Sequence, residues 1–447
     1  MTPFVLDNLF HIDRLSITMM GLVAFIGVCV GSFAYRYLKG DSHYQSFFIW
    51  LTLLIGSVML MVSADHLLLL LGAWCVSNGL LVRLMIYKTS WRAAKAAGLL
   101  ATKNFIGGAV GVASAFGLFY ATTGQTSVQA VIHQPTLSPA LLLALVLLLV
   151  GAMTQSAIWP FHRWLISSLN SPTPVSAIMH AGLINGGGFL LARFAPLYLQ
   201  SPVLLTAIVI IGFLTALLGT LWKLLQSDVK RMLACSTMSQ MGFMFVQCGL
   251  GLFPAAVAHL VWHGMFKAYL FLASGSAAKE KRVDQAYPPT ALAFVAALVC
   301  GLVGSFSFAV SSGKVWLAGD TSFLLVVVAF LTASQFALPI LQSNPLRMLP
   351  GALVGTGLFG LVYGGSVQLI SWFMAPMELM QPQALNGYHV AGLLALTLAW
   401  LSQLFLRKKE KEAPASNWML KGYVTALNAS QPHPDTVTTH RNHYRYQ

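Results

Sequence analysis

The sequence predicts an all-α fold in which a bundle of helices spans a lipid membrane. The chain has 447 residues, of which 57% are hydrophobic and only 9% are charged, and its mean hydropathy is +0.73. A soluble domain of this size has no use for so much apolar surface, whereas a set of membrane helices does. Apolar runs long enough to cross a bilayer recur along the chain, and every second connector between them is basic. These observations together predict a polytopic membrane protein.

The apolar runs give the expected helices in order, because each can cross a hydrocarbon layer of roughly 30 Å. They lie near residues 15–37, 45–63, 66–86, 104–121, 138–158, 174–195, 203–222, 233–251, 254–275, 290–310, 322–343, 349–370 and 388–406. We therefore expect about 13 transmembrane helices. The division predicts a membrane domain over residues 1–406 and a polar tail over residues 407–447. Met1 to Arg14 contains acids and aromatic residues, so we expect no cleavable signal before the first helix.

The connectors between these runs predict the orientation of the chain. Lys and Arg gather after the odd-numbered runs, as Arg36/Lys39, Lys88/Arg92/Lys95, Arg163, Lys223/Lys230/Arg231, Lys279/Lys281/Arg282, Arg347 and Arg407/Lys408/Lys409/Lys411. The even-numbered connectors are nearly free of them, apart from Arg193 and Lys314. By the positive-inside rule the N-terminus is outside and the tail is cytoplasmic. The formal net charge of +14 is thus an orientation signal and not a nucleic-acid surface.

An interruption after the fifth run predicts a broken helix. Ile158-Trp-Pro-Phe-His-Arg-Trp164 departs from the apolar pattern, and the next helix starts at Ser171-Pro-Thr-Pro174. Proline removes a backbone donor and disfavours helix in the residue before it. Irregular backbone at membrane depth is tolerated only where protein or water satisfies it, as at the ion sites of transporters. A plain loop at the cytoplasmic surface is the alternative.

Ionisable residues in the apolar runs predict an ion pathway. His259, His263 and Lys267 recur every four residues and therefore share one face of a helix. Single histidines on apolar faces are usually hydrogen-bonded core residues, but three ionisable groups on one stripe of a membrane helix favour a proton relay. His180, in the helix after the interruption, either continues this row or simply packs. Asp228 and Lys230 lie in a basic turn, where a surface pair that marks orientation is the simpler interpretation.

Other residue patterns argue against covalent chemistry in this chain. The five cysteines have no metal-ligand spacing, and there is no nucleophile elbow, phosphate-binding loop or dinucleotide fingerprint. We therefore predict no enzyme activity, no cofactor and no metal site. Lys103 and Arg83 lie near helix ends, where long basic side chains reach the membrane interface. Gly186-Gly-Gly188 is better explained by close helix packing or a bend than by phosphate binding.

Several ordered motifs resemble one family of membrane proteins. They are Ile12 to Met19, Tyr37 to Asp41, Ala64 to Leu68 with Trp74, Ser156-Ala157, Ser171 to Ala177 with His180, Asp228 to Ala234 with Ser236 to Gln240, and His259 to Phe271. The chain resembles, over roughly residues 10–315, the antiporter-like subunits of respiratory NADH–quinone oxidoreductase (chain 5) and of Mrp cation/proton antiporters. The resemblance implies a helical bundle with broken helices and a central hydrated line of Lys, His and Glu that moves protons.

The resemblance assigns site residues one by one. The matching positions are His180, Lys230, His259, His263 and Lys267. Three positions depart from the family pattern: Cys75 replaces a membrane glutamate after the tryptophan, Gln155 replaces a lysine before Ser-Ala, and Ile106 replaces an acid after the basic residue at Lys103. Lys314 is a weaker match to a further family lysine. The missing Glu and Lys are the pair thought to couple family subunits to their neighbours.

The tail narrows the resemblance. Ala426 to Pro434 and His440 to Tyr444 are similar to the DabB-type membrane subunits of bacterial inorganic carbon accumulation systems. That resemblance implies a DabA-like partner related to β-type carbonic anhydrase, which carries zinc, and a gradient of H+ or Na+ across the bacterial inner membrane as the energy source. The alternatives are a cation/proton antiporter or complex I-like pump subunit, and a purely structural membrane anchor for a soluble enzyme.

Overall fold

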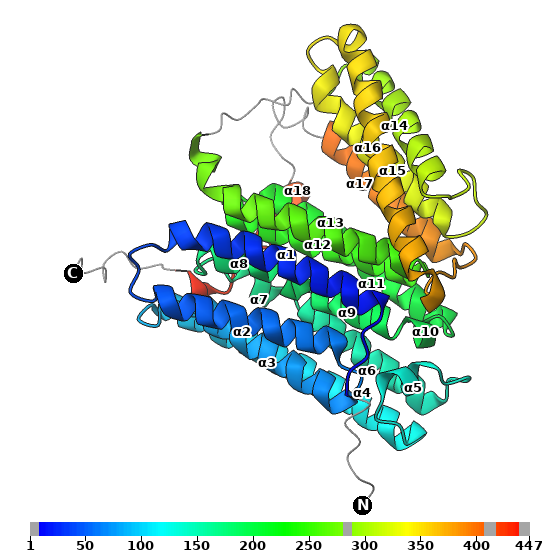
Figure 1. Cartoon of the computed structure of the whole chain (residues 1–447). Helices are drawn as coiled ribbons and strands as arrows, with labels where there is room; N and C mark the ends of the chain where they lie inside the picture. The colour runs from blue at the N-terminus through cyan, green and yellow to red at the C-terminus, as the bar shows by residue number, and fades with distance from the viewer. Residues whose placement is uncertain (1–8, 280–287, 406–416, 438–447) are drawn as a thin grey trace, which may run out of the picture.

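A computed structural model describes residues 9–279, 288–405 and 417–437, and in this part the regular elements are helices. They are α1 (Arg14–Tyr37), α2 (Tyr44–Ser63), α3 (Leu67–Met85), α4 (Arg92–Thr123), α5 (Val128–Ile132), α6 (Pro139–Gln155), α7 (Arg163–Ile166), α8 (Thr173–Ala181), η2 (Leu183–Asn185), α9 (Gly186–Arg193), α10 (Ala195–Tyr198), α11 (Pro202–Leu225), α12 (Val229–Gly249), α13 (Phe253–Ala273), η3 (Ser274–Lys279), α14 (Ala291–Ser311), α15 (Ser322–Leu341), α16 (Pro345–Met374), η4 (Ala375–Met377), α17 (Gly387–Phe405), α18 (Asn417–Ala429) and η6 (Pro434–Thr436). Figure 1 shows their arrangement.

The prediction of an all-α, multi-pass membrane bundle is confirmed. Within the described residues, 11 helical segments are long and apolar enough to cross a membrane. The expected count of 13 is not confirmed by this criterion. Two of the expected runs form helices that do not meet the criterion, and one of them is α6, which has only 17 residues. The other is α12, whose Ser, Thr, Gln and basic residues make it the most polar of the long helices in the bundle.

The chain interrupts its helices twice near the centre of the bundle. The predicted break is confirmed: α6 ends at Gln155, Ala157 has a positive φ of 51°, and a cis peptide bond precedes Pro160. A second break falls at Gly182, where α8 ends and η2 and α9 follow; α9 begins at Gly186, in the stretch for which the sequence suggested close packing or a bend, and a Cβ atom on Gly187 would collide with the Ala152 carbonyl. Side chains pair with backbone carbonyls at both breaks: Trp164 Nε1 donates to the Thr154 carbonyl at 3.1 Å, and Ser156 Oγ donates to the Ile184 carbonyl at 2.7 Å.

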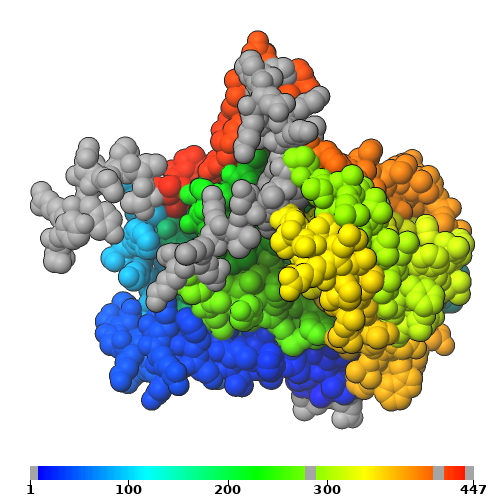
Figure 2. Space-filling model, turned by 90° about the horizontal axis from the view of Figure 1, so that it is seen from above, coloured from blue at the N-terminus to red at the C-terminus, as the bar shows by residue number. Residues whose placement is uncertain are grey.

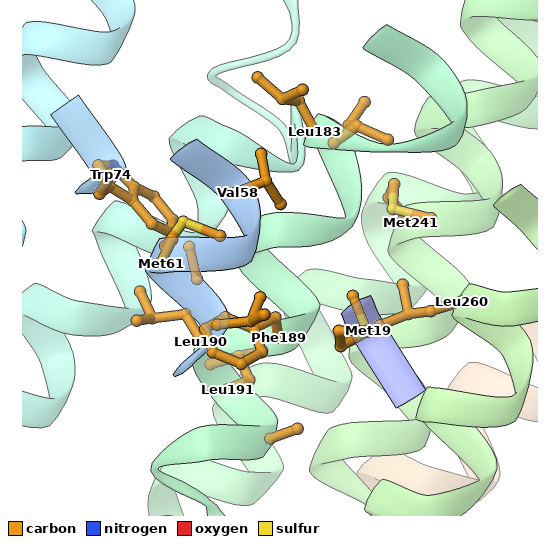
Figure 3. Close-up of a cluster of buried hydrophobic side chains, with 14 of the residues drawn as sticks. Met19, Val58, Met61, Trp74, Leu183, Phe189, Leu190, Leu191, Met241 and Leu260 are labelled. Carbon is orange, nitrogen blue, oxygen red and sulfur yellow. The ribbon is translucent and has the colours of Figure 1, made fainter. Parts of the chain in front are cut away.

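The broken segment α8–η2–α9 lies in the middle of the first part of the bundle. It packs against α1, α3, α6, α12 and α13, and the apolar window of residues 173–193 is entirely buried. Figure 3 shows part of the core around it, in which Leu190 and Leu191 of α9 and Leu260 of α13 belong to the same buried cluster as Met19, Met61 and Trp74. A segment enclosed by protein on all sides can keep its irregular backbone and polar side chains inside a membrane.

Glycines bring α11 and α12 into close contact. A Cβ atom on Gly212 would lie 2.7 Å from the Gly242 carbonyl, and one on Gly242 would lie 2.5 Å from the Ala216 amide. Without a hydrophobic driving force between helices in lipid, such small-residue contacts are what hold membrane helices together. This pair positions α12, which supplies one wall of the polar interior described below.

The last four long helices form a group of their own. α14 packs on α15 and α16, and the group joins the first part through α16 against α13 and α17 against α11. Figures 1 and 2 show α14, α15 and α16 standing to one side of α12 and α13. A backbone bridge between Leu252 and Met380 ties the two parts together where α13 begins.

The described part of the tail folds back onto one end of the bundle. The His433 amide donates to Ser167 Oγ at 2.9 Å, Asn170 Nδ2 donates to the Thr436 carbonyl at 2.8 Å, and Gln226 donates to Ser430 Oγ at 2.8 Å. We call this the tail-bearing end; α12 begins here and α13 ends here. The predicted boundary at residues 406 and 407 and the basic segment from His440 to Tyr444 lie outside the described residues.

Gly264 offers a test of the packing between α13 and α8. A Cβ atom there would lie 2.8 Å from the Ala181 carbonyl, so Gly264→Ala must push the two helices apart. We expect a loss of about 1–3 kcal/mol in the apparent free energy of unfolding, measured in detergent micelles. Gly117→Ala in α4 is the matched control, because nothing lies within 4 Å of its added Cβ atom, and it should be neutral or stabilising. Equal stability of the two variants would contradict the proposed tight contact.

Candidate ion pathway

One face of α13 carries the predicted row of ionisable side chains. Pro254 occupies the first turn of the helix, where its missing N–H costs nothing, and no later proline interrupts the helix. His259, His263 and Lys267 are 7%, 5% and 1% exposed, so the spacing of four residues places all three inside the protein. Phe271 continues the same face one turn further on. Burying three ionisable groups costs free energy, so their presence in a membrane interior points to a function.

A hydrogen-bond network connects Lys267 to His180. Lys267 Nζ donates to the Leu233 carbonyl at 3.2 Å, and Thr237 Oγ1 donates to the same carbonyl at 3.0 Å. His180 Nδ1 lies 3.0 Å from Thr237 Oγ1, and its ring stacks on Phe271 at 4.3 Å between centroids. Three helices, α8, α12 and α13, therefore meet at this point. The structure brings His180 together with the row on α13.

His263 occupies the middle of the row and has no hydrogen-bond partner among the described residues. Neither of its ring nitrogens has a hydrogen bond to the described residues, and the same is true of His259 Nε2. The two imidazole rings are 6.1 Å apart between centroids, and no hydrogen bond joins them. Unpaired buried polar atoms with this spacing are the normal lining of water sites in proteins. A proton can pass along the row only with water between its members.

The row contains no acidic residue among the described positions. Only three ion pairs fall within 4 Å in that part of the chain, and none involves His180, His259, His263 or Lys267. Like charges on neighbouring members repel strongly in a low-dielectric interior. The row therefore cannot carry several positive charges at once without a large cost in free energy.

Lys230 and Asp228 lie at the tail-bearing end. Asp228 is exposed and caps α12 by accepting a hydrogen bond from the Arg231 amide at 2.9 Å. Lys230 is half-buried and turns toward the start of α8, where it donates to the Ser171 carbonyl at 3.1 Å. The simple surface pair suggested by the sequence does not form as an ion pair within 4 Å. Lys230 instead reaches toward the segment that carries His180.

The positions that depart from the family pattern separate in space. Gln155 is buried, and its Nε2 donates to Asn78 Oδ1 at 3.0 Å and to the Leu183 carbonyl at 3.1 Å. Cys75 and Lys103 are exposed, and Ile106 is 59% exposed, so these three side chains do not reach the interior. The polar residue of α3 that faces Gln155 is Asn78, which the sequence analysis missed.

The sequence analysis also missed two further neutral polar residues of the interior. Thr237 links His180 to α12, and Asn185 lies at the second helix break, where its Nδ2 donates to the Ala181 carbonyl at 2.8 Å. Asn185 Nδ2 also lies 3.5 Å from the Leu260 carbonyl, and its Oδ1 has no partner among the described residues. The signal in the sequence that could have identified these residues is that each is a neutral polar residue inside a long apolar run.

Lys314 stands apart from the row. It follows the end of α14 and is half-buried, and burial lowers its pKa while the nearby Asp320 carboxylate acts in the opposite direction. No hydrogen bond or ion pair in the described part of the chain connects its side chain to the α13 row.

The fold and this interior define a class: multi-pass membrane proteins in which interrupted helices enclose a buried line of His and Lys. A family model described as NADH:quinone oxidoreductase/Mrp antiporter, TM, matches residues 63–292. A second, described as NADH-Ubiquinone oxidoreductase (complex I), chain 5 N-terminus, matches residues 1–48. The chain therefore belongs to the NADH:quinone oxidoreductase/Mrp antiporter family, which confirms the resemblance seen in the sequence motifs.

Individual relatives fall into two named groups. A protein of Halothiobacillus neapolitanus named "Probable inorganic carbon transporter subunit DabB1" is 38% identical over 287 residues, which cover 62% of this chain and 51% of the relative. The Bacillus subtilis protein named "Probable inorganic carbon transporter subunit DabB" is 38% identical over 61% of this chain and 55% of its own length. "NADH-quinone oxidoreductase subunit L" of Escherichia coli is 39% identical over 59% of this chain and 44% of its own length.

A solved structure shares the fold. The structure of the Mrp complex from Dietzia sp. DQ12-45-1b matches with a TM-score of 0.58 at 23% identity, covering 95% of this chain and 45% of that chain. The chain thus spans about half the length of the relatives it matches. The similarity to DabB subunits predicted from the tail is confirmed at the level of sequence.

Proposed function

We propose that this chain is the membrane subunit of an energy-coupled inorganic carbon accumulation complex. It conducts H+ or Na+ down its gradient through His180, His259, His263 and Lys267, with Lys230 at the tail-bearing end. The ion flow drives a DabA-like partner, related to carbonic anhydrase and carrying zinc, to hydrate CO2 in one direction. The chain itself is a transporter subunit and catalyses no covalent step.

The buried row carries this proposal. A structural anchor has no reason to bury Lys267 at 1% exposure beside two histidines without a carboxylate nearby, because each such group destabilises the fold. An ion route explains the cost. The similarity to proteins named as inorganic carbon transporter subunits supports the choice of substrate.

The orientation and the partner surface follow from the connectors. The basic odd-numbered connectors support a tail-bearing end that faces the cytoplasm of a bacterial inner membrane. α18, at this end, has no buried residue and exposes Trp418, Leu420, Tyr423 and Val424 at 44–76%. An exposed apolar helix beside a membrane surface supports docking of the soluble partner here.

A cation/proton antiporter or complex I-like pump subunit is the alternative, favoured by the 39% identity to subunit L of Escherichia coli. The neutral pair Gln155–Asn78 argues against it. Two amides that satisfy one another cannot gain or lose charge, whereas a pump that couples neighbouring subunits needs a charged pair at this place.

Growth of a carbonic-anhydrase-deficient bacterium in ambient air tests the proposal. We expect rescue when this gene is expressed together with the neighbouring reading frame for a carbonic-anhydrase-like protein, and no rescue with either gene alone. An uncoupler should abolish the rescue, because the flow of ions supplies the driving force. Both proteins are to be quantified in the membrane fraction as a control. Failure of a well-expressed, co-purifying pair to rescue growth, together with cation/proton exchange in vesicles, would support the antiporter instead.

A further inference from the structure

The α13 row stops short of the end of the bundle opposite the tail. Toward that end, α13 has only Phe253 to Ala258 beyond His259, and all six of these residues are apolar and buried. An ion that reaches His259 therefore needs polar groups from other helices to leave the protein. The pair Asp13–Arg193 lies at the same end, but its charges satisfy one another, and the other hydrogen bonds of Arg193 go to Ser16 and the Val62 carbonyl and not to the row.

α12 supplies one such group. The Phe243 ring contacts the His259 ring at 5.6 Å between centroids, and Gln247 lies one turn further along α12, on the same face. Gln247 is 2% exposed and is the last polar side chain of the helix. Its Oε1 has no hydrogen-bond partner among the described residues, as expected of a group that holds water.

α16 supplies the second group. Tyr363 packs in the same cluster as Phe243 and Val246, which flank Gln247 on α12, and its ring stacks on Phe308 at 5.8 Å. Trp262 of α13 fixes the position of α16, because its Nε1 donates to Ser366 Oγ at 2.8 Å, one turn from Tyr363. Tyr363 is half-buried, so it lies between the closed interior and the surface.

We propose that Gln247 and Tyr363 form the outer segment of the ion pathway, between His259 and the non-cytoplasmic side. In this segment an amide oxygen and a hydroxyl hold the water that carries the ion, in place of the imidazoles and amine of the row. The inference rests on the proposed function and adds to it the exit route. It also gives α16 a role in transport, beyond closing the side of the bundle.

Substitutions that preserve volume test this segment in the two-gene strain. We expect Gln247→Leu to lower the initial rate of energised inorganic carbon uptake on the order of tenfold, because one polar group of the route is lost. Tyr363→Phe should lower it several-fold. Gln247→His, which restores a polar group, should recover most of the rate. A merely structural glutamine would instead tolerate leucine at least as well as histidine.

The controls separate this inference from the function on which it rests. Gln368→Leu and Tyr388→Phe change exposed residues of α16 and α17 in the same way and should leave uptake unchanged. The amount of partner that co-purifies is to be measured for every variant. Full uptake by Gln247→Leu and Tyr363→Phe, with uptake lost in Lys267→Met, would overturn the outer segment alone. Full uptake by Lys267→Met as well would overturn the pathway itself.

Discussion

Replacing Lys267 by methionine is expected to abolish energised uptake while leaving the protein assembled with its partner. Lys267 is 1% exposed and donates to the Leu233 carbonyl, which Thr237 shares on the way to His180. Methionine fills a similar volume and is apolar, so it should not disturb the core. It removes the only amine of the row, and we expect a loss on the order of 100-fold or more, as for other groups that transfer protons. Initial uptake rates, normalised to the amount of complex, provide the measurement.

Two variants control for charge and for fold. Lys103→Met makes the same change at an exposed position of α4 and should leave uptake unaltered, provided that the lysine only reaches the membrane interface. Lys267→Arg keeps a positive charge but cannot release its proton, so it should fail like methionine if protons move. Substantial uptake by Lys267→Arg would favour Na+ as the ion, and full uptake by Lys267→Met would remove Lys267 from the mechanism.

Replacing Arg193 by leucine is expected to have the largest effect on stability. The Arg193 guanidinium pairs with Asp13, and it also donates to Ser16 Oγ at 2.8 Å and to the Val62 carbonyl at 3.1 Å. It is 3% exposed and lies over the Phe189 ring. One side chain thus joins α9, α1 and α2. Loss of one partner of a buried ion pair leaves the other charge uncompensated, which costs about 3–5 kcal/mol.

The stability cost of Arg193→Leu should depend on pH, because Asp13 titrates. Burial alone would raise the pKa of Asp13, but Arg193 and the hydrogen bonds from Ser16 outweigh burial and hold this pKa below its ordinary value. In the wild type, the stability from this carboxylate is complete above the ordinary carboxyl pKa of about 4 and is lost as the pH falls further. In Arg193→Leu the hydrogen bonds from Ser16 remain, but the guanidinium that opposed burial is gone. The pKa of Asp13 should therefore rise, and protonation of Asp13 should relieve part of the defect.

Unfolding in detergent micelles at pH 7 and near pH 4 measures both effects. The difference between Arg193→Leu and the wild type should be smaller at the lower pH. Arg36→Leu is the matched control, since Arg36 is exposed at the end of α1, and its cost should stay below about 1 kcal/mol. A cost for Arg193→Leu that matches the control, or that grows toward low pH, would contradict the role of the ion pair.

Much of the site was visible in the sequence because helical spacing is a local property. His259, His263 and Lys267 share a face at any position of α13 in the bundle, and the sequence shows that spacing directly. The position of His180 relative to the row was left open, and the contact through Thr237 decides it. Cys75 was singled out from the resemblance, yet it is exposed, and the buried side chain of α3 that meets Gln155 is Asn78. Whether this site conducts ions remains the proposal tested above.

The sequence by itself determined the class of protein, most of the long helices and the first helix break. Hydropathy, charge in the connectors and proline positions are properties of short segments, and a membrane converts them into spans and loops. Only the tertiary structure decided which polar residues meet. The second break at Gly182, the pair Gln155–Asn78, and the positions of Gln247 and Tyr363 beside the row depend on how separate helices pack and rotate against one another. That rotation is fixed by close contacts such as Gly264 against Ala181, which no single segment contains.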